Sequence, residues 1–517
     1  FKRFTYFVNK ELTNKTFLQR IGNGDFLTLD DIKEAFSVEK VTKEFYQDIA
    51  NWYFWAVSQC QFPKDAEKTL DERDNISIIR LITRMIFIWF MREQDLINKD
   101  LFNKQKIGSI LRNLEEGESS YYKAILQNLF FATLSTKKEK RDFRSEIRGY
   151  KGINPDRGND NVYRYQKLFK NPEKLKEYFD NIPFLNGGLF ECLDDRKNNH
   201  YVDGFTESKK DNQPQVPNLL FFATEKKVDL NKAYGTKNKN YKVRGLIEIL
   251  SSFNFTIDEN SPDDADIALD PELLGRVFEN LLASFNPETS TTARKATGSY
   301  YTPREVVDYM VVESLKAYFK THLADIEKID EKLERLFSNK YQENPFDEVE
   351  SRKLVNLIES VKIVDPAVGS GAFPMGILNR MVFILGRVDK DNNLWKEAQT
   401  RATELIPDIN VRNKIKKEIK NYFDTKQPDY WRKLYLIQNC IYGVDIQQIA
   451  VEITKLRFFI SLLVDEDKKD IQPLPNLDFK IMQGNSLLEE YEGIKLFDEK
   501  LLEAQENIQI QIEETRR

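Results

Sequence analysis

The segment 364–373, Val-Asp-Pro-Ala-Val-Gly-Ser-Gly-Ala-Phe, constrains the fold of this chain more than any other feature. The short apolar run 361–364 leads into it, and the apolar stretch 375–385 follows it. This order is typical of a strand that enters a tight turn and continues into a helix. Gly369 and Gly371 have no Cβ, so the backbone there can turn sharply and a ligand can approach it closely. The segment therefore predicts a ligand-binding turn at the end of a strand, in an α/β fold.

The residues around these glycines distinguish between nucleotide cofactors. A dinucleotide-binding turn carries a Gly or Ala three residues after its second glycine, and Pro374 stands there instead. Asp365 comes directly before the turn, which favours S-adenosylmethionine over NAD as the ligand. The residues expected to bind this cofactor at the turn are Asp365, Pro366, Ala367, Gly369, Gly371 and Phe373.

Residues 296–305, Ala-Thr-Gly-Ser-Tyr-Tyr-Thr-Pro-Arg-Glu, predict the start of a helix. Thr302 can serve as its N-cap, and Glu305 can complete a capping box. Pro303 fits the first helical position, where its missing N–H needs no partner. One apolar face follows at helical spacing, formed by Val307, Val311, Leu315 and Tyr318. The amino end of this helix, with Tyr301, Thr302 and Pro303, is expected to contact the cofactor.

Together these motifs resemble those of the gamma-class adenine-N6 DNA methyltransferases, most closely those within single-chain type IIG restriction–modification enzymes. Two more family-like phrases are Phe-Leu-Asn-Gly-Gly-Leu-Phe-Glu at 184–191 and Leu-Asp-Pro-Glu-Leu-Leu-Gly-Arg-Val-Phe-Glu-Asn-Leu-Leu at 269–282, so the resemblance extends over about 37–488. It implies a Rossmann-like sheet that binds S-adenosylmethionine, double-stranded DNA as partner, and adenine-specific methylation within a restriction–modification system. For the parent enzyme it leaves open an additional endonuclease activity.

Residues 440–446, Cys-Ile-Tyr-Gly-Val-Asp-Ile, predict a second strand that ends in a carboxylate. At this place in nucleotide-binding sheets an acidic residue accepts both ribose hydroxyls, so we expect Asp445 to hold the ribose and Ile446 to pack on the adenine. Alternatively, Asp445 caps the following helix. Asp445 lies 80 residues after Asp365, whereas the plain unit places its acidic residue about 20 residues after the turn. Residues 387–438 are therefore expected to form a mostly helical insertion.

Residues 479–487, Phe-Lys-Ile-Met-Gln-Gly-Asn-Ser-Leu, predict a third strand and a turn in which Asn485 hydrogen-bonds the adenine edge of the cofactor. In the family, an Asn-or-Asp-Pro-Pro-aromatic loop after this motif binds the amine of a flipped adenine. The nearest sequences here, at 154–156, 286–288 and 344–346, lack the second proline. We therefore name no catalytic residue. The chain is expected to be a fragment, with the catalytic loop and a target-recognition domain beyond residue 517.

Composition adds weaker constraints. The chain has 517 residues, 31% of them charged, and a net charge of −5, which fits two or three domains and does not by itself demand nucleic acid. Three widely separated cysteines and two histidines indicate no metal site and a reducing, cytoplasmic location. The most apolar run, 76–91, is interrupted by two arginines and is shorter than the roughly 20 residues that span a bilayer. We expect no membrane partner, and the oligomeric state is left open.

Four regions follow from these patterns. Residues 1–245 are expected to form a mainly helical N-terminal or connector domain whose periodic aromatic residues are core, with a loop-rich, Lys-containing stretch at 194–244. Residues 246–298 are a helical linker region, in which the acidic stretch 258–266 is a solvated connector into a helix at 271–282. Residues 299–490 form the incomplete S-adenosylmethionine-binding domain, and 491–517 begin a further helical segment.

Two other functional classes stay open. An RNA or protein-glutamine methyltransferase shares the cofactor-binding half of such an enzyme. A non-catalytic DNA-binding scaffold of a phage-defence system would keep the fold without the chemistry. The sequence that follows residue 517 distinguishes them, because a catalytic loop and a recognition domain there favour DNA methylation.

Overall fold

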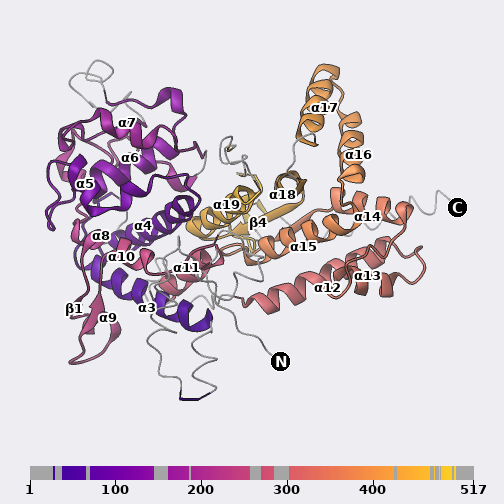
Figure 1. The fold of residues 1–517 in the computed structure, drawn as a ribbon, viewed down its shortest axis with the longest axis horizontal. Helices are drawn as coiled ribbons and strands as arrows, with labels where there is room; N and C mark the ends of the chain where they lie inside the picture. The colour runs from indigo at the N-terminus through magenta and orange to yellow at the C-terminus, as the bar shows by residue number, and fades with distance from the viewer. Residues whose placement is uncertain are drawn as a thin grey trace.

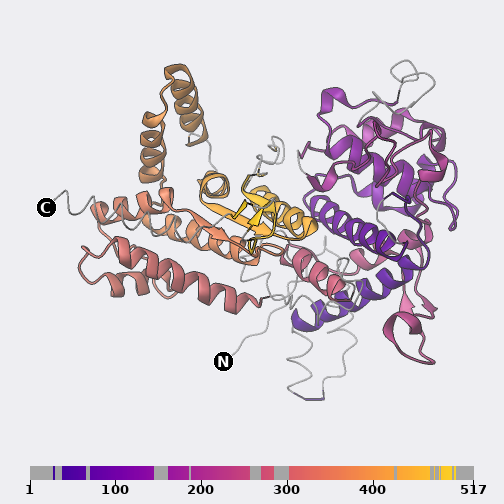
Figure 2. The ribbon, with the colours of Figure 1, turned by 180° about the vertical axis from the view of Figure 1, so that it is seen from behind.

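A mainly helical half and a half that contains a parallel sheet make up the chain (Figure 1). The structure is a computed structural model and describes residues 27–28, 38–65, 70–144, 161–185, 188–256, 269, 271–284, 302–423, 428–465, 471, 477, 479–488, 490–491 and 494–495. Helices α11 (Glu272–Ser284) and α19 (Gln448–Leu463) lie between the two halves, as the view from behind also shows (Figure 2).

Two long helices that pack against each other form the base of the helical half, α3 (Val38–Val57) and α4 (Leu70–Glu93). Trp52 is fully buried, and its indole N–H donates to the carbonyl of Leu220 at 2.7 Å, so no polar atom of this side chain is left unsatisfied. The prediction that the periodic residues are core is confirmed, because all of the following are buried: Phe45, Ile49, Trp52, Trp55, Ala56, Ile78, Leu81, Ile82, Met85, Ile86 and Trp89.

Shorter helices complete this half. The stretch 121–134 is one buried helical run with wide π turns at both ends, made of η3 (Tyr121–Leu126), α6 (Gln127–Leu129) and η4 (Phe130–Leu134). The others are η2 (Lys99–Phe102), α5 (Lys104–Ile110), η5 (Lys138–Lys140), η6 (Gln166–Leu168), α7 (Glu173–Phe179), η7 (Gly188–Phe190), η8 (Lys210–Asn212), α8 (Leu219–Phe222), α9 (Asn231–Tyr234) and α10 (Leu246–Ser251).

The stretch 194–244 is largely irregular, as its composition predicts. It also contains a small antiparallel hairpin that we did not expect, β1 (Lys226–Val228) with β2 (Tyr241–Val243). The ammonium group of Lys226 lies 4.6 Å from the ring centre of Trp55, so this lysine packs on the helical half. The acidic stretch 258–266 lies outside the described residues.

The second half is built on three parallel strands in the order β3 (Ile363–Asp365), β4 (Ile441–Asp445) and β5 (Ile481–Gln483). Asp365 lies opposite Gly443, and Asp445 lies opposite Gln483. Because the three strands run the same way, their carboxyl ends meet at one edge of the sheet. These strands confirm a parallel α/β unit in which β3, β4 and β5 follow the three predicted motifs. The larger Rossmann-like sheet stays a prediction.

Four helices that flank β3 in the sequence pack on one another beside the sheet: α12 (Arg304–His322), α13 (Ile329–Phe337), α14 (Glu348–Ser360) and α15 (Ala372–Val388). Helix α12 lies close against α15, since a Cβ on Gly376 would be 2.8 Å from a methyl carbon of Val307. The predicted apolar face of α12 is present. Its fourth fully buried member is Phe319, while Tyr318 is only partly buried.

The start of α12 differs from the predicted capping box. The helix begins at Arg304, Pro303 is the cap residue with an extended ψ of 145°, and no side chain caps the helix. The carbonyl of Pro303 accepts hydrogen bonds from the N–H groups of Val306 and Val307, both at 3.0 Å. The predictions of Thr302 as N-cap and of Pro303 as first helical residue are therefore wrong. The extended backbone of Pro303 places Thr302 one residue too early for its hydroxyl to cap.

The insertion between the glycine turn and Asp445 is helical, as expected. Helices α16 (Asn393–Ala402) and α17 (Ile409–Phe423), joined by η10 (Thr403–Leu405), project from the body (Figure 1). Helix α18 (Pro428–Asn439) instead packs on α15, α19 and β4. Helix α16 also packs on α14, and its Trp395 is fully buried, so the insertion is anchored on the helices beside the sheet.

Beyond β5 the structure describes few residues. Strands β6 (Glu490–Tyr491) and β7 (Ile494–Lys495) pair in antiparallel fashion at the point where we expected a helical segment to begin. Residues 496–517 lie outside the described residues. Among the helices that the structure does describe, none combines the length and the apolar character needed to cross a membrane.

Candidate functional site

The glycine turn joins β3 to α15 at the carboxyl edge of the sheet. Asp365 ends β3, and one of its carboxylate oxygens accepts a hydrogen bond from the N–H of Ala367 at 3.0 Å. Gly369 and Gly371 have φ angles of 52° and 87°, a left-handed region that favours glycine. A Cβ on Gly371 would lie 2.9 Å from the side chain of Thr454, so the turn leaves no room for a larger residue. The predicted succession of strand, turn and helix is confirmed.

Asp445 lies at the end of the neighbouring strand and bonds the glycine turn. The N–H of Gly369 donates to its Oδ2 at 2.9 Å, and the N–H of Gln447 donates to its Oδ1 at 2.8 Å. Gln447 is the cap residue of α19, so the carboxylate supports the start of this helix as well as the turn. Each carboxylate oxygen has a second acceptor site, which leaves Asp445 able to bind a ligand. Ile446, half exposed at 50%, offers apolar surface beside it.

The residues that follow β5 contact both the end of β4 and the glycine turn. The N–H of Gly484 donates to the carbonyl of Asp445 at 2.9 Å, and the hydroxyl of Ser486 donates to the carbonyl of Pro366 at 2.7 Å. Asn485 lies between these two contacts and is exposed. The structure therefore brings together, at the ends of three adjacent strands, the predicted residues Asp365, Pro366, Ala367, Gly369, Gly371, Asp445, Ile446 and Asn485.

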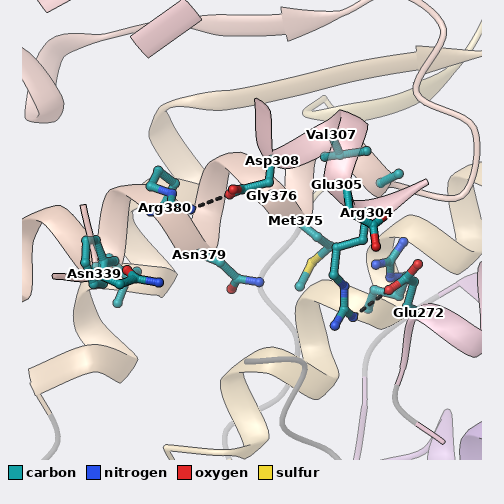
Figure 3. A pocket seen from close by; sticks show the side chains of 14 residues that line it. Glu272, Arg304, Glu305, Val307, Asp308, Asn339, Met375, Gly376, Asn379 and Arg380 are labelled. Carbon is teal, nitrogen blue, oxygen red and sulfur yellow. Dashed lines mark hydrogen bonds and ion pairs between the residues drawn. The ribbon is translucent and has the colours of Figure 1, made fainter. Parts of the chain in front are cut away.

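The amino end of α12 lies beside that of α15, and the two helices line a cavity of about 780 Å³ (Figure 3). Two ion pairs lie in the wall of this cavity: Arg304 pairs with Glu272 of α11, and Arg380 pairs with Asp308. Thr302 and Pro303 directly precede Arg304. Within the described part of the chain no hydrogen bond joins either residue to the glycine turn. Tyr301 lies outside the described residues, so the cofactor role of all three stays a prediction.

A second hollow of about 500 Å³ lies between α12 and the edge strand β3. Pro366 and Phe373 line it together with Asp365, and apolar residues of α12 form its other wall. Val364 in β3 is 64% exposed. Phe373 thus lies on the α12 side of the turn and shares this hollow with Asp365, whereas Asp445 does not line it.

One oxygen of Asp365, Oδ2, is buried and has no hydrogen-bond partner among the described residues. Burial raises the pKa of this carboxyl group, and the nearby charge of Asp445 raises it further, while the N–H of Ala367 lowers it. An unsatisfied buried acceptor is costly in a folded protein, and a bound hydrogen-bond donor or cation relieves that cost. The site therefore fits a ligand with donor groups or positive charge.

Four residues that the sequence did not single out hold the glycine turn. The hydroxyl of Thr454 donates to the carbonyl of Gly369 at 3.1 Å, and the guanidinium of Arg457 donates to the carbonyl of Ser370 at 2.9 Å. The hydroxyl of Ser370 in turn donates to a carboxylate oxygen of Glu279 at 2.9 Å. Backbone and side-chain contacts from α11, β4 and α19 thus fix the turn in one conformation.

A sequence signal exists for two of these residues. Thr454 and Arg457 are two of several polar residues in the mainly apolar helix α19, and they are its least exposed polar side chains, at 0% and 2%. Polar residues enclosed in an apolar helix need a partner in the interior, which here is the backbone of the glycine turn. Glu279 and Ser370 gave no such signal, because their contact joins residues that are 91 positions apart.

Comparison with known proteins adds to this geometry. Residues 439–515 match the model of the Eco57I restriction-modification methylase family. The match contains β4, α19 and β5, and therefore Asp445, Ile446 and Asn485. The glycine turn lies outside the matched residues.

A relative from Methanocaldococcus jannaschii carries the provisional name type II restriction enzyme and methyltransferase. It is 25% identical to this chain over 494 residues, which cover 87% of this chain and 32% of the relative. The chain thus spans about a third of that relative's length. No solved structure matches the chain.

Proposed function

We propose that this chain provides the S-adenosylmethionine-binding part of a DNA methyltransferase, specific for the N6 amine of adenine, in a restriction–modification enzyme of type IIG. The observation that carries the proposal is the convergence of Asp365, the glycine turn, Asp445 and Asn485 at the ends of three adjacent parallel strands. Ligands of α/β sheets bind at this edge. The family match over 439–515 and the relative's name support the methyltransferase class.

The residues present suit an adenosyl ligand. Asp445 keeps free acceptor sites for the ribose hydroxyls, exposed Ile446 offers an apolar surface for the adenine, and exposed Asn485 can bond the adenine edge. The unpartnered oxygen of Asp365 suits a ligand that lies against the turn and offers a hydrogen-bond donor or a positive charge. When bound, S-adenosylmethionine supplies an activated methyl group on its sulfonium.

The DNA-directed part of the function concerns the whole protein. Its substrate is double-stranded DNA, from which an adenine is flipped and its amine is held by an Asn-Pro-Pro-aromatic loop. This chain contains no such loop. We therefore expect the isolated chain to bind the cofactor and to transfer no labelled methyl groups to adenine in duplex DNA. Transfer by this chain alone would contradict the second expectation.

Calorimetric titration with S-adenosylmethionine tests the cofactor site. We expect measurable heat for the wild-type chain and a loss for Asp445→Ala, which removes the ribose acceptor, and for Gly371→Val, which blocks the turn. Gly117 has no atom within 4 Å of its Cβ position, so Gly117→Val is a matched control that should bind normally. Equal heats from the wild type and both site variants would remove the proposed site.

A further inference from the structure

Helix α11 brings a residue from outside the sheet-bearing half to the glycine turn. It packs on α19 on one side and on α4 and α3 of the helical half on the other. It lies between the two halves in Figure 1. Glu279 is a residue of this helix. Its position at the turn therefore depends on how the two halves pack on α11.

Glu279 bonds the turn at Ser370 and lies near Gly369. Its Oε1 accepts the hydroxyl hydrogen bond of Ser370 at 2.9 Å. The same oxygen would lie 3.6 Å from a Cβ built on Gly369, which is ordinary van der Waals contact. Its other oxygen, Oε2, is buried and has no hydrogen-bond partner among the described residues. The side chain therefore uses only part of its bonding capacity within the protein.

Glu279 adds to an excess of negative charge around Gly369. The carboxylate of Asp445 bonds the N–H of Gly369, and Asp365 ends the adjacent strand. Burial raises the pKa of Glu279, and the charge of Asp445 raises it further, while Ser370 and Arg457 lower it. The guanidinium of Arg457 bonds the carbonyl of Ser370. Among the described residues, the carboxylates of Glu279, Asp445 and Asp365 thus lie at or next to the turn, and the guanidinium of Arg457 bonds it.

A positive charge on the ligand relieves this excess, since the interaction of charges is stronger in a partly buried site than in water. S-adenosylmethionine carries a positive sulfonium. Its demethylated product, S-adenosylhomocysteine, carries a neutral thioether at the same place. The electrostatics of the turn therefore distinguish the two ligands by charge, although their adenosine parts are identical.

We propose that Glu279 is a specificity-determining residue of this site, whose carboxylate favours the cationic methyl donor over the neutral product. The inference rests on the proposed function, because it assumes that the turn binds an adenosyl ligand. It assigns the helical half a share in the site, through α11. It also gives the site a physical means to release the product after transfer, because the favourable charge interaction is lost with the methyl group.

The test measures dissociation constants for three ligands by calorimetry: S-adenosylmethionine, S-adenosylhomocysteine, and sinefungin, which carries an amine cation in place of the sulfonium. Glu279→Gln removes the charge and keeps an oxygen that can accept from Ser370. We expect it to weaken both cationic ligands about tenfold and to leave the neutral product within roughly twofold. Glu248→Gln, at an exposed position of α10, is the matched control and should change none of the three.

The outcomes separate the two proposals. If the wild-type chain binds none of the three ligands, the proposed function fails. If it binds all three and Glu279→Gln weakens them equally, Glu279 only supports the turn and the charge preference is refuted. The wild-type chain provides a check that does not depend on the variant's folding. Equal affinity for sinefungin and for S-adenosylhomocysteine in the wild type would also overturn the inference.

Discussion

The backbone N–H of Gly369 donates to the carboxylate of Asp445 at 2.9 Å, although the two residues lie 76 positions apart. This bond joins the turn after β3 to the end of β4. A second N–H, that of Gln447, donates to the other oxygen of the same carboxylate. The shape of the turn and the start of α19 thus depend on one side chain, which is also the proposed ribose ligand.

Replacement of Asp445 by Asn is expected to affect both roles. An amide offers one acceptor oxygen, so one of the two N–H groups would face a donor. We expect the free energy of unfolding to fall by about 1–2 kcal/mol and the affinity for S-adenosylmethionine to fall about tenfold or more. Urea unfolding and calorimetry measure the two effects. Asp211→Asn, in the exposed helix η8, is the control. Unchanged stability and affinity in Asp445→Asn would contradict both roles.

A substitution at Gly443 tests how closely the glycine turn packs on the sheet. A Cβ at this position in β4 would lie 2.7 Å from the side chain of Val368, which precedes the two glycines of the turn. Gly443→Ala is expected to cost about 1–3 kcal/mol of stability through overpacking. Gly117→Ala meets no atom within 4 Å and serves as the control. Urea unfolding of both variants checks the prediction. Equal urea midpoints for Gly443→Ala and Gly117→Ala would show that the side chain of Val368 moves aside without loss of stability, which would contradict it.

The raised pKa of Asp365 predicts a dependence of stability on pH. Because burial raises this pKa above the ordinary value of 3.8, the folded chain keeps a proton in a pH range where the unfolded chain has lost it. The contribution of Asp365 to stability is therefore greatest in acid and is lost as the pH rises through the folded-state pKa.

Asp365→Asn removes this titration and keeps an oxygen that can accept from Ala367. In the absence of ligand, we expect the variant to gain stability relative to the wild type as the pH rises from 4 to 7. Urea unfolding of both proteins across this range measures the difference between their free energies of unfolding. Glu279 also has a raised pKa, but it is present in both proteins, so its effect cancels in this difference. A variant that loses stability relative to the wild type over the same rise would contradict the burial of this carboxyl group.

The helical half contains a buried ion pair that should matter for stability and not for the site. Arg84 in α4 pairs with Asp203 at 3.1 Å, and both side chains are at least 94% buried, with exposures of 3% and 6%. Arg84→Met leaves the carboxylate unpaired and is expected to cost about 3–5 kcal/mol. Arg352→Met, which breaks an exposed pair with Glu397, should change the stability far less, because water screens the two charges. Thermal unfolding compares the two, and a similar small loss from both would contradict the prediction.

The sequence predicted the parts of the site that depend on local pattern. Asp365, Gly369, Gly371 and Asp445 each follow an apolar strand segment, and the strands place them together because parallel strands share a carboxyl edge. The start of α12 was predicted one residue too early, since proline is acceptable both at the cap and in the first turn. Local pattern does not distinguish these two placements.

The contact between Glu279 and Ser370 could not be predicted in this way. It depends on how α11 packs between the helical half and α19, which no local spacing encodes. The same holds for α18, whose packing on β4 separates it from the projecting pair α16 and α17. Long-range packing thus decides which polar residues reach the turn, while local pattern decides where the turn is.

The most direct test of the account is an experimental structure of this chain with S-adenosylmethionine. We predict ligand density at the carboxyl ends of β3, β4 and β5, with the ribose at Asp445 and the rest of the ligand along the turn from Gly369 to Gly371. Density at another place, with Asp445 and the turn free of ligand, would contradict the central claim that these strand ends form a methyl-donor site.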